Sequence, residues 1–417
     1  MKTKSFLISM LCLFFVLSLN SKSQAQTGST FEVYGFAMAE AGYNFKTIDP
    51  KWYDALRVTK LPANKQEFLP DGKIFYSVRQ SRLGVKSSTP TNVGVIKTQF
   101  EFDMFGVGDY AGQTTIRLRQ AWGSIGKFLA GQTNSTFMDG DVFPNSLEYW
   151  GPTGMIFFRN IQIRYTPLMT KQDNLAFALE NPGASGDGGV VNEFTPALST
   201  VKSLFNVPDL TAHYRYTGNW GYVQVGGVLG SLKWVNTDTN STYIPDGEGE
   251  PVYLQLNGSA VRWGGTISTN INIGKKAIFR GQYVYGEGME NYMNDAPVDV
   301  AVTRNYEGNT IEQPIRGKAL PVWGATAFVD VNWSKLFSSS FGYSVTTIKN
   351  TNLQTKDAYK QGQYGLVNLL YYPMNNVMAG VEYNYGRRDN YGGSFHSTTS
   401  EVRFAFKYNF SKIFTFD

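Results

Sequence analysis

The sequence predicts an all-β fold, a transmembrane antiparallel β-barrel of 16 strands with an inward-folded constriction loop. Three observations predict it. Side chains alternate between apolar and polar with a period of two along many short segments. After residue 25 no stretch reaches 18 uncharged apolar residues, which excludes a helical membrane protein. Long connections also alternate with short ones, as expected for outer loops and periplasmic turns.

The N-terminal segment predicts export. Lys2 and Lys4 precede an apolar run from Phe6 to Leu19, and small residues follow up to Ala25. The run is about 14 residues, too short to span a bilayer, so we expect residues 1–25 to be a signal peptide cleaved after Ala25. Residues 26–417 then form a single outer-membrane barrel domain in a Gram-negative cell.

Composition excludes two other classes of protein. The chain has a single cysteine, Cys12, which lies in the signal peptide, so a disulfide scaffold is excluded. Removal of Lys2, Lys4 and Lys22 lowers the net charge from +5 to about +2. This balance gives no argument for a nucleic-acid partner.

The alternation is clearest at the C-terminus, where Phe404, Phe406 and Tyr408 oppose Arg403 and Lys407. One face suits lipid and the other water. Seventeen segments show such a pattern. They are 31–45, 74–87, 93–104, 114–125, 127–136, 160–167, 173–180, 209–217, 220–234, 252–264, 265–274, 277–288, 321–334, 340–349, 361–373, 376–388 and 399–410.

An even number of strands is expected of a bacterial single-chain barrel, so one boundary must be an error, and the division near Gly264 is the weakest. A soluble β-sandwich also alternates. Here the pattern runs over about 380 residues without a linker, and the polar face carries charges that a soluble interior would not tolerate. The connections 46–72, 181–208 and 289–320 are long, whereas Pro373 to Asn376 is short.

Arginines are predicted to line the pore. Arg117 and Arg119 oppose Ile116 and Leu118 on one segment, so they should point into the lumen. The same argument places further arginines on the polar wall, with a parity slip at 79–82 that suggests a bulge. These residues are Arg79, Arg82, Arg164, Arg215, Arg262 and Arg280. Guanidinium groups bind carboxylates, so such a wall would concentrate anions; the alternative is that they only solvate a wet wall.

The connection 134–159 carries Asp139, Asp141 and Glu148 and occupies the position where porin loops fold inward. Acidic residues there, facing a basic wall, would create a transverse field. Alternatively, the loop folds over the rim and its acids are merely exposed. Asp139 and Asp141 have a spacing compatible with calcium, but two acids alone are weak ligands, so we predict no metal.

An enzyme is not predicted, and no cofactor is expected. The two histidines are His213, on the polar face beside Arg215, and His396, in a Gly/Ser-rich stretch. Neither comes with a nucleophile and base pattern, and two histidines without a cysteine leave little for zinc.

Three runs carry a resemblance to a known family. They are Gly131 to Asp139 (GQTNSTFMD) with Gly151 and Pro152, Arg159 to Pro167 (RNIQIRYTP), and Arg79 to Gly84 (RQSRLG). Together they resemble the DcaP-like trimeric outer-membrane porins. The resemblance implies a 16-stranded homotrimeric barrel that passes small, often anionic solutes such as dicarboxylates, and that sits among outer-membrane lipid and lipopolysaccharide.

The sequence therefore predicts a passive porin for small anionic solutes, filtered by lumenal arginines that face an acidic loop. Two alternatives stay open. One is a general or sugar-type pore in which aromatic residues line the path. The other is a structural or adhesive surface barrel whose lumen is closed.

Overall fold

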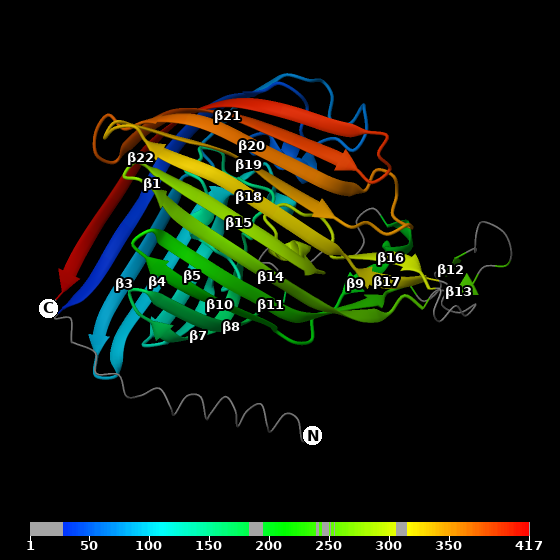
Figure 1. The fold of residues 1–417 in the computed structure, drawn as a ribbon, viewed down its shortest axis with the longest axis horizontal. Helices are drawn as coiled ribbons and strands as arrows, with labels where there is room; N and C mark the ends of the chain where they lie inside the picture. Colours follow the sequence, from blue (N-terminus) through cyan, green and yellow to red (C-terminus); the bar gives the residue numbers. More distant parts are fainter. Residues whose placement is uncertain are drawn as a thin grey trace.

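A computed structural model shows a closed antiparallel barrel of 16 strands, as predicted (Figure 1). It describes residues 28–182, 195–238, 242–243, 250, 252–253, 255–305 and 315–416. The predicted signal peptide lies outside the described residues. The barrel strands are β1 (Ser29–Asn44), β2 with β3 (Lys73–Ser77, Arg82–Thr91), β4 (Gly94–Phe105), β5 (Thr114–Ile125), β6 (Phe128–Asn134), β7 (Arg159–Met169), β8 (Asp173–Glu180), β10 (Asp209–Gly218), β11 (Gly221–Asn236), β14 (Gly258–Ile273), β15 (Ala277–Glu287), β18 (Pro321–Asn332), β19 (Phe337–Ile348), β20 (Tyr359–Tyr371), β21 (Val377–Asn390) and β22 (His396–Phe416).

The first and last strands close the cylinder. β1 pairs with β22 along its whole length, from Ser29 opposite Phe416 to Asn44 opposite Glu401. Figure 1 shows the blue β1 beside the red β22. Closure supplies backbone partners to strands that would otherwise be edges, which a bilayer requires because it offers no water to unpaired N–H and C=O groups.

The predicted alternation is confirmed on these strands. On β22, Phe404 and Phe406 are 58% and 54% exposed on the outer surface, whereas Glu401 and Arg403 are fully buried inside. The inward groups are buried because loops fill much of the lumen. The polar face therefore meets protein in many places where the sequence alone suggested water.

The count of 16 strands, against seventeen predicted segments, depends on two places in the wall. The predicted segments 252–264 and 265–274 form the single strand β14, so the division near Gly264 was wrong. β2 and β3 together form one wall strand beside β1. Residues 78–81 interrupt this wall strand. These four residues lie opposite only three residues of β1, 37–39, so the interrupted strand carries one extra residue, which is the bulge that the parity slip at 79–82 suggested.

The two ends of the barrel differ. At the end that carries Phe416 the turns are short, such as 126–127 and 219–220. At the other end the connections are long, among them 45–72, 135–158, 181–208 and 288–320. This asymmetry is the outer-membrane arrangement, with the long connections outside the cell.

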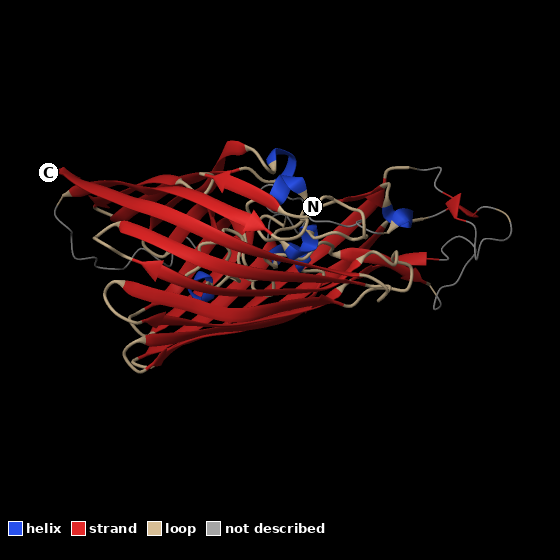
Figure 2. Ribbon diagram, turned by 90° about the horizontal axis from the view of Figure 1, so that it is seen from above, coloured by secondary structure: helices blue, strands red, loops and turns tan. Residues whose placement is uncertain are grey.

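Three long connections fold into the lumen, where Figure 2 shows short helical turns within the outline of the strands. They are the loop 45–72, with η1 (Pro50–Trp52) and η2 (Val58–Lys60); the constriction loop, residues 135–158, with η4 (Gly140–Val142); and the loop 288–320, with η7 (Glu290–Tyr292). Phe137, Ile156 and Tyr292 belong to one apolar cluster and Trp52 and Leu56 to another, both built partly from wall residues. The inward fold predicted for the constriction loop is therefore confirmed.

Smaller elements complete the described chain. They are η3 (Gly108–Tyr110), η5 (Pro196–Leu198), β9 (Val201–Ser203), β12 (Thr242–Tyr243), β13 (Val252–Tyr253), β16 (Val300–Arg304) and β17 (Ile315–Ala319). None of the helices in the described part of the chain is long and apolar enough to cross a membrane.

A candidate solute site in the lumen

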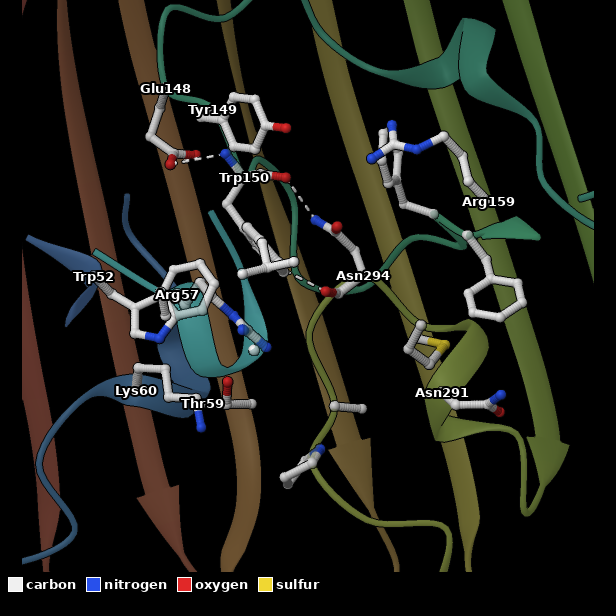
Figure 3. Close-up of a pocket in the computed structure, with 18 of the residues that line it drawn as sticks. Trp52, Arg57, Thr59, Lys60, Glu148, Tyr149, Trp150, Arg159, Asn291 and Asn294 are labelled. Carbon is white, nitrogen blue, oxygen red and sulfur yellow. Dashed lines mark hydrogen bonds between the residues drawn. The ribbon is translucent and has the colours of Figure 1, made fainter. Parts of the chain in front are cut away.

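The three inward loops and one side of the wall enclose a cavity of about 600 Å³ (Figure 3). Its floor and sides come from β3, β5 and β7 together with the loops 45–72, 135–158 and 288–320. It is the candidate solute site because its lining includes wall arginines that the sequence predicted to face the pore.

Three of the predicted arginines line this cavity. Arg82 lies on β3, and its Nη1 is 3.6 Å from Glu101 Oε1. On β5, Arg117 Nη2 lies 3.0 Å from Asp103 Oδ2, and Arg119 Nη1 lies 2.7 Å from the same oxygen. Strand parity brings these side chains inward, since Ile116 and Leu118 between and beside them are exposed on the outer face.

Arg159, the first residue of β7, is a fourth cavity arginine that the sequence analysis missed. Figure 3 shows its guanidinium directed into the space beside Tyr149. The guanidinium lies 5.4 Å from the Phe157 ring centroid and forms no hydrogen bond or ion pair with any residue that the structure describes. Strict alternation would place it on the outer face with Ile161 and Ile163, but the chain enters β7 from an inward loop, so alternation fails at this residue.

The strand side of the cavity carries an excess of positive charge, whereas the acids of the lining, Asp49, Glu148, Glu290 and Asp299, come from the inward loops. Arg82, Arg117, Arg119 and Arg159 gather around two carboxylates, Glu101 and Asp103, which both lie on β4. Two positive charges in this group therefore have no acidic counterpart among the contacts of the described wall. A partly desolvated site with surplus guanidinium favours anions.

Tyr149 of the constriction loop is inserted into this cluster. Its hydroxyl donates a hydrogen bond to Asp103 Oδ2 at 2.6 Å and accepts one from Arg119 Nη1 at 2.8 Å and another from Arg117 Nη2. Its ring stacks on Phe105 with centroids 3.8 Å apart. The constriction loop thus contacts the cluster of Arg117 and Arg119 through a neutral hydroxyl and not through an acid.

Five of the predicted arginines do not line the cavity, and two of them are paired with buried acids. Arg79 and Arg262 are fully buried. Arg79 Nη1 lies 2.6 Å from Asp54 of the loop 45–72, and Arg262 Nη1 lies 2.6 Å from Asp209 on β10. Arg262 also donates to the carbonyl of Gly288, so both arginines hold loops against the wall.

Of the remaining predicted arginines, Arg215 and Arg280 contact the constriction loop, and Arg164 contacts the end of β6 just before it. Arg215 pairs with Asp139 at 2.7 Å and with Asp141 at 2.5 Å. Arg280 donates to the backbone carbonyl of Asp141, and its Nε lies 2.6 Å from Asp330 on β18. Arg164 donates to Gln162 and to the carbonyl of Asn134. Asp139 and Asp141 therefore meet a wall arginine directly, without an open gap between the charges.

Glu148 lines the cavity, but its hydrogen bonds come from the protein's own loops. Its carboxylate accepts N–H donors from Leu56 at 3.1 Å, Trp150 at 2.9 Å and Gly151 at 2.5 Å. Burial raises the pKa of this carboxyl to about 7, while the Arg403 guanidinium and the two nearby backbone donors, Trp150 and Gly151, act in the opposite direction. Glu148 thus ties the loop 45–72 to the constriction loop.

Wall carboxylates anchor both ends of the constriction loop. Glu180 on β8 accepts from the Thr136 N–H at 2.9 Å and from the Ser135 hydroxyl at 2.9 Å. Glu382 on β21 accepts from the Leu147 N–H at 2.7 Å and from the Glu148 N–H at 2.9 Å. The loop is therefore held at a defined depth in the lumen. Sequence pattern gave no sign of either anchor.

The mouth of the cavity is also basic and aromatic. The Arg57 guanidinium lies 4.4 Å from the Trp52 ring centroid and 4.0 Å from that of Trp150, and it pairs with Asp295 at 3.0 Å. Lys51 and Lys60 line the same space. Trp150 also donates to the carbonyl of Asn294, which links the constriction loop to the loop 288–320 (Figure 3).

The two histidines lie apart from the cavity lining. His213 is on β10, inside the barrel, with Nδ1 2.8 Å from the Thr136 carbonyl oxygen and Nε2 2.9 Å from Asn174 Oδ1. His396 is the first residue of β22, at the long-loop end. Neither belongs to the cluster that holds the arginines.

Comparison with known proteins identifies a family and solved structures that resemble this barrel. A family model described as "DcaP outer membrane protein" matches residues 20–256. The solved outer membrane channel DcaP of Acinetobacter baumannii is similar over 93% of this chain and 99% of its own, with 18% sequence identity and a TM-score of 0.72. No curated protein sequence matches significantly.

Two more distant structures share the fold. The anion-selective porin from Comamonas acidovorans has a TM-score of 0.55 at 9% identity, with 92% of this chain and 100% of that chain covered. The trimer form of OmpT from Vibrio cholerae has a TM-score of 0.52 at 13% identity, again with 92% and 100% covered. At these identities the likeness concerns the barrel architecture.

Proposed function

The chain belongs to the DcaP outer membrane protein family, and from this premise we propose that it is a passive channel selective for small anionic, dicarboxylate-like solutes. That it is an outer-membrane channel follows from the family. The proposal concerns what passes. Porin families are transport channels, and we extend this to the present chain as a protein without enzymatic activity, metal or cofactor.

One observation carries the proposal. Four guanidinium groups, those of Arg82, Arg117, Arg119 and Arg159, line one side of the cavity, and only two carboxylates, Glu101 and Asp103, pair with them from behind. The acids of the lining itself, Asp49, Glu148, Glu290 and Asp299, come from the inward loops. An anion entering this space finds surplus positive charge and N–H donors in a partly desolvated setting, and a cation meets repulsion. A second carboxylate on the same solute has further cations available at the mouth, where Lys51 and Lys60 lie.

The reversal potential across a planar bilayer in a KCl gradient tests this proposal. We expect the wild-type potential to shift toward that of chloride, and Arg159→Gln combined with Arg82→Gln to reduce the shift. Arg387→Gln is the matched control, because Arg387 pairs with Asp389 away from the cavity lining. A wild-type potential near that of potassium would refute anion selectivity.

A sugar-type pore is the second candidate, and aromatic lining favours it. Trp52, Tyr149 and Trp150 all face the cavity, and aromatic rings suit the apolar faces of sugars. Block of the ion current by neutral oligosaccharides, with no effect of succinate, would support this candidate. A closed structural or adhesive barrel would instead give no unit conductance at all.

We also propose that three copies assemble, in a membrane of phospholipid and lipopolysaccharide. The solved V. cholerae relative has a trimer form, and Ala37 and Ala39 are small exposed residues on the outer face of β1 that permit close approach of a second copy. Native mass spectrometry of the detergent-extracted protein tests the trimer. In the same preparation, a mature chain that begins at Gln26 would support cleavage after Ala25.

A further inference from the structure

The arginine cluster already holds one neutral oxygen from the protein itself. The Tyr149 hydroxyl accepts hydrogen bonds from Arg119 and Arg117, and it lines the cavity. Asp103, which pairs with the same arginines, is fully buried behind them. The Tyr149 hydroxyl also donates to Asp103 Oδ2 at 2.6 Å, so it lies beside that carboxylate, with the tyrosine in the cavity lining and Asp103 outside it.

We infer that Tyr149 is a specificity-determining residue: its hydroxyl engages N–H donors of Arg117 and Arg119 that would otherwise be available to an anionic oxygen of the solute. This inference rests on the proposed anion selectivity. The hydroxyl is neutral, so it holds the guanidinium groups in place without cancelling their charge. The cavity keeps its attraction for anions while its strongest pair of donors is partly occupied.

The arrangement leaves Arg159 as the first contact for the solute. In the described structure this guanidinium lies over the Phe157 ring and makes no hydrogen bond or ion pair, whereas Arg119 is shared among Glu101, Asp103 and Tyr149. A channel must bind its solute strongly enough to admit it and weakly enough to release it. A tyrosine hydroxyl that competes for two arginines weakens binding in this sense, and loss of that hydroxyl should slow release.

Tyr149→Phe isolates the hydroxyl, because the ring that stacks on Phe105 remains. Tyr222→Phe is the matched control. Its hydroxyl donates to Asp139, which pairs with Arg215, and so it removes the same group from an arginine–aspartate pair outside the cavity lining. The full-length protein is reconstituted in planar bilayers, with succinate as the probe and sucrose as the neutral reference. The measured quantity is the duration of succinate-induced current blocks.

We expect Tyr149→Phe to lengthen the succinate blocks about three- to tenfold, since one more hydrogen bond of ordinary net strength becomes available to the solute. Sucrose events should not change, Tyr222→Phe should not lengthen succinate blocks, and adding Arg159→Gln should shorten the lengthened blocks. If Tyr149→Phe fails to give the folded, heat-modifiable form, Tyr149→Leu also removes the hydroxyl and keeps an apolar contact with Phe105.

The outcomes separate the inference from the function on which it rests. Succinate blocks that are unchanged or shortened in the tyrosine variants, in a channel that still prefers anions, would overturn the role of Tyr149 alone. A wild-type channel with neither anion preference nor succinate blocks would refute both. Longer blocks for succinate and sucrose alike would also overturn the inference, because they would indicate a change of pore width instead of freed donors.

Discussion

The Arg215 guanidinium lies 2.7 Å from the Asp139 carboxylate, and this contact joins β10 of the wall to the loop that narrows the lumen. Asp139 is fully buried and also accepts hydrogen bonds from Tyr222 at 2.8 Å and Ser268 at 2.5 Å. The pair is thus part of an anchor. Charges that a sequence pattern assigns to a filter here hold the filter in position.

Asp139→Asn tests this anchor. The substitution removes the buried charge of the pair and leaves Arg215 with Asp141 as its remaining partner. Its cost should therefore stay below that of a fully broken buried pair, about 3–5 kcal/mol. We expect a lower temperature for the heat-modifiable shift in detergent gels and larger fluctuations of the open-channel current. Arg387→Gln, at an exposed pair, should change neither. A quiet channel of unchanged thermal stability in Asp139→Asn would show that the pair does not hold the loop.

Glu382→Ala tests the anchor at the other end of the constriction loop. The substitution leaves the Leu147 and Glu148 N–H groups without their acceptor, at about 1–3 kcal/mol for each unsatisfied donor. The loop should withdraw from the wall, with larger unit conductance and weaker exclusion of large polyethylene glycols. Glu382→Gln retains one acceptor oxygen, so its unit conductance should lie between those of the wild type and Glu382→Ala. Equal conductance in all three proteins would argue against this role.

Arg159 and Arg262 should respond to the same substitution in opposite ways. Arg262 is fully buried with Asp209, so Arg262→Gln should destabilise the barrel by about 3–5 kcal/mol. Arg159 has no ion pair in the described structure, so Arg159→Gln should leave the stability unchanged and reduce the anion preference. The thermal shift and the reversal potential, measured on both variants, test these opposite responses. A reversed pattern would contradict the assignment of the two residues.

Anion preference should fall as the pH rises from 6 to 8. Burial raises the pKa of Glu148 to about 7, so the carboxyl is neutral below this pH and negative above it. The pKa of Glu148 is higher in the folded than in the unfolded protein. Its contribution to the stability of the folded protein is therefore full at acid pH and is lost as the pH rises through 7. Reversal potentials across this range measure the effect. Glu148→Gln should abolish the dependence, and a dependence of equal size in that variant would assign it to other groups.

The strand pattern was predictable because alternation is a local property. Each residue of β18 or β22 faces lipid or lumen according to its immediate neighbours, so Phe404 and Arg403 could be placed without any knowledge of the rest of the chain. The one wrong boundary and the one missed arginine lie where the local rule is interrupted. Gly264 lacks a side chain to mark its face, and Arg159 follows a loop instead of a strand residue.

The residues that line the cavity were harder to predict from the sequence than the strands. Arg117 and Arg119 were identified by parity, but parity also selected Arg79 and Arg262, which the structure buries against loops. A period of two separates inside from outside, and it does not tell water inside a barrel from protein inside a barrel. Only contacts between residues far apart in sequence make that distinction.

Such contacts account for the constriction. Leu147 reaches Glu382 across 235 positions, and Thr59 reaches Asp295 across 236. Nothing in the neighbourhood of either residue announces its partner. The amino-acid order alone thus suffices for the compartment, the closed cylinder and the facing of its strands, since those follow from a repeat two residues long in a bilayer. The arginines left open to a solute depend on how three loops pack against one another and against the wall, and that packing exists in the folded molecule alone.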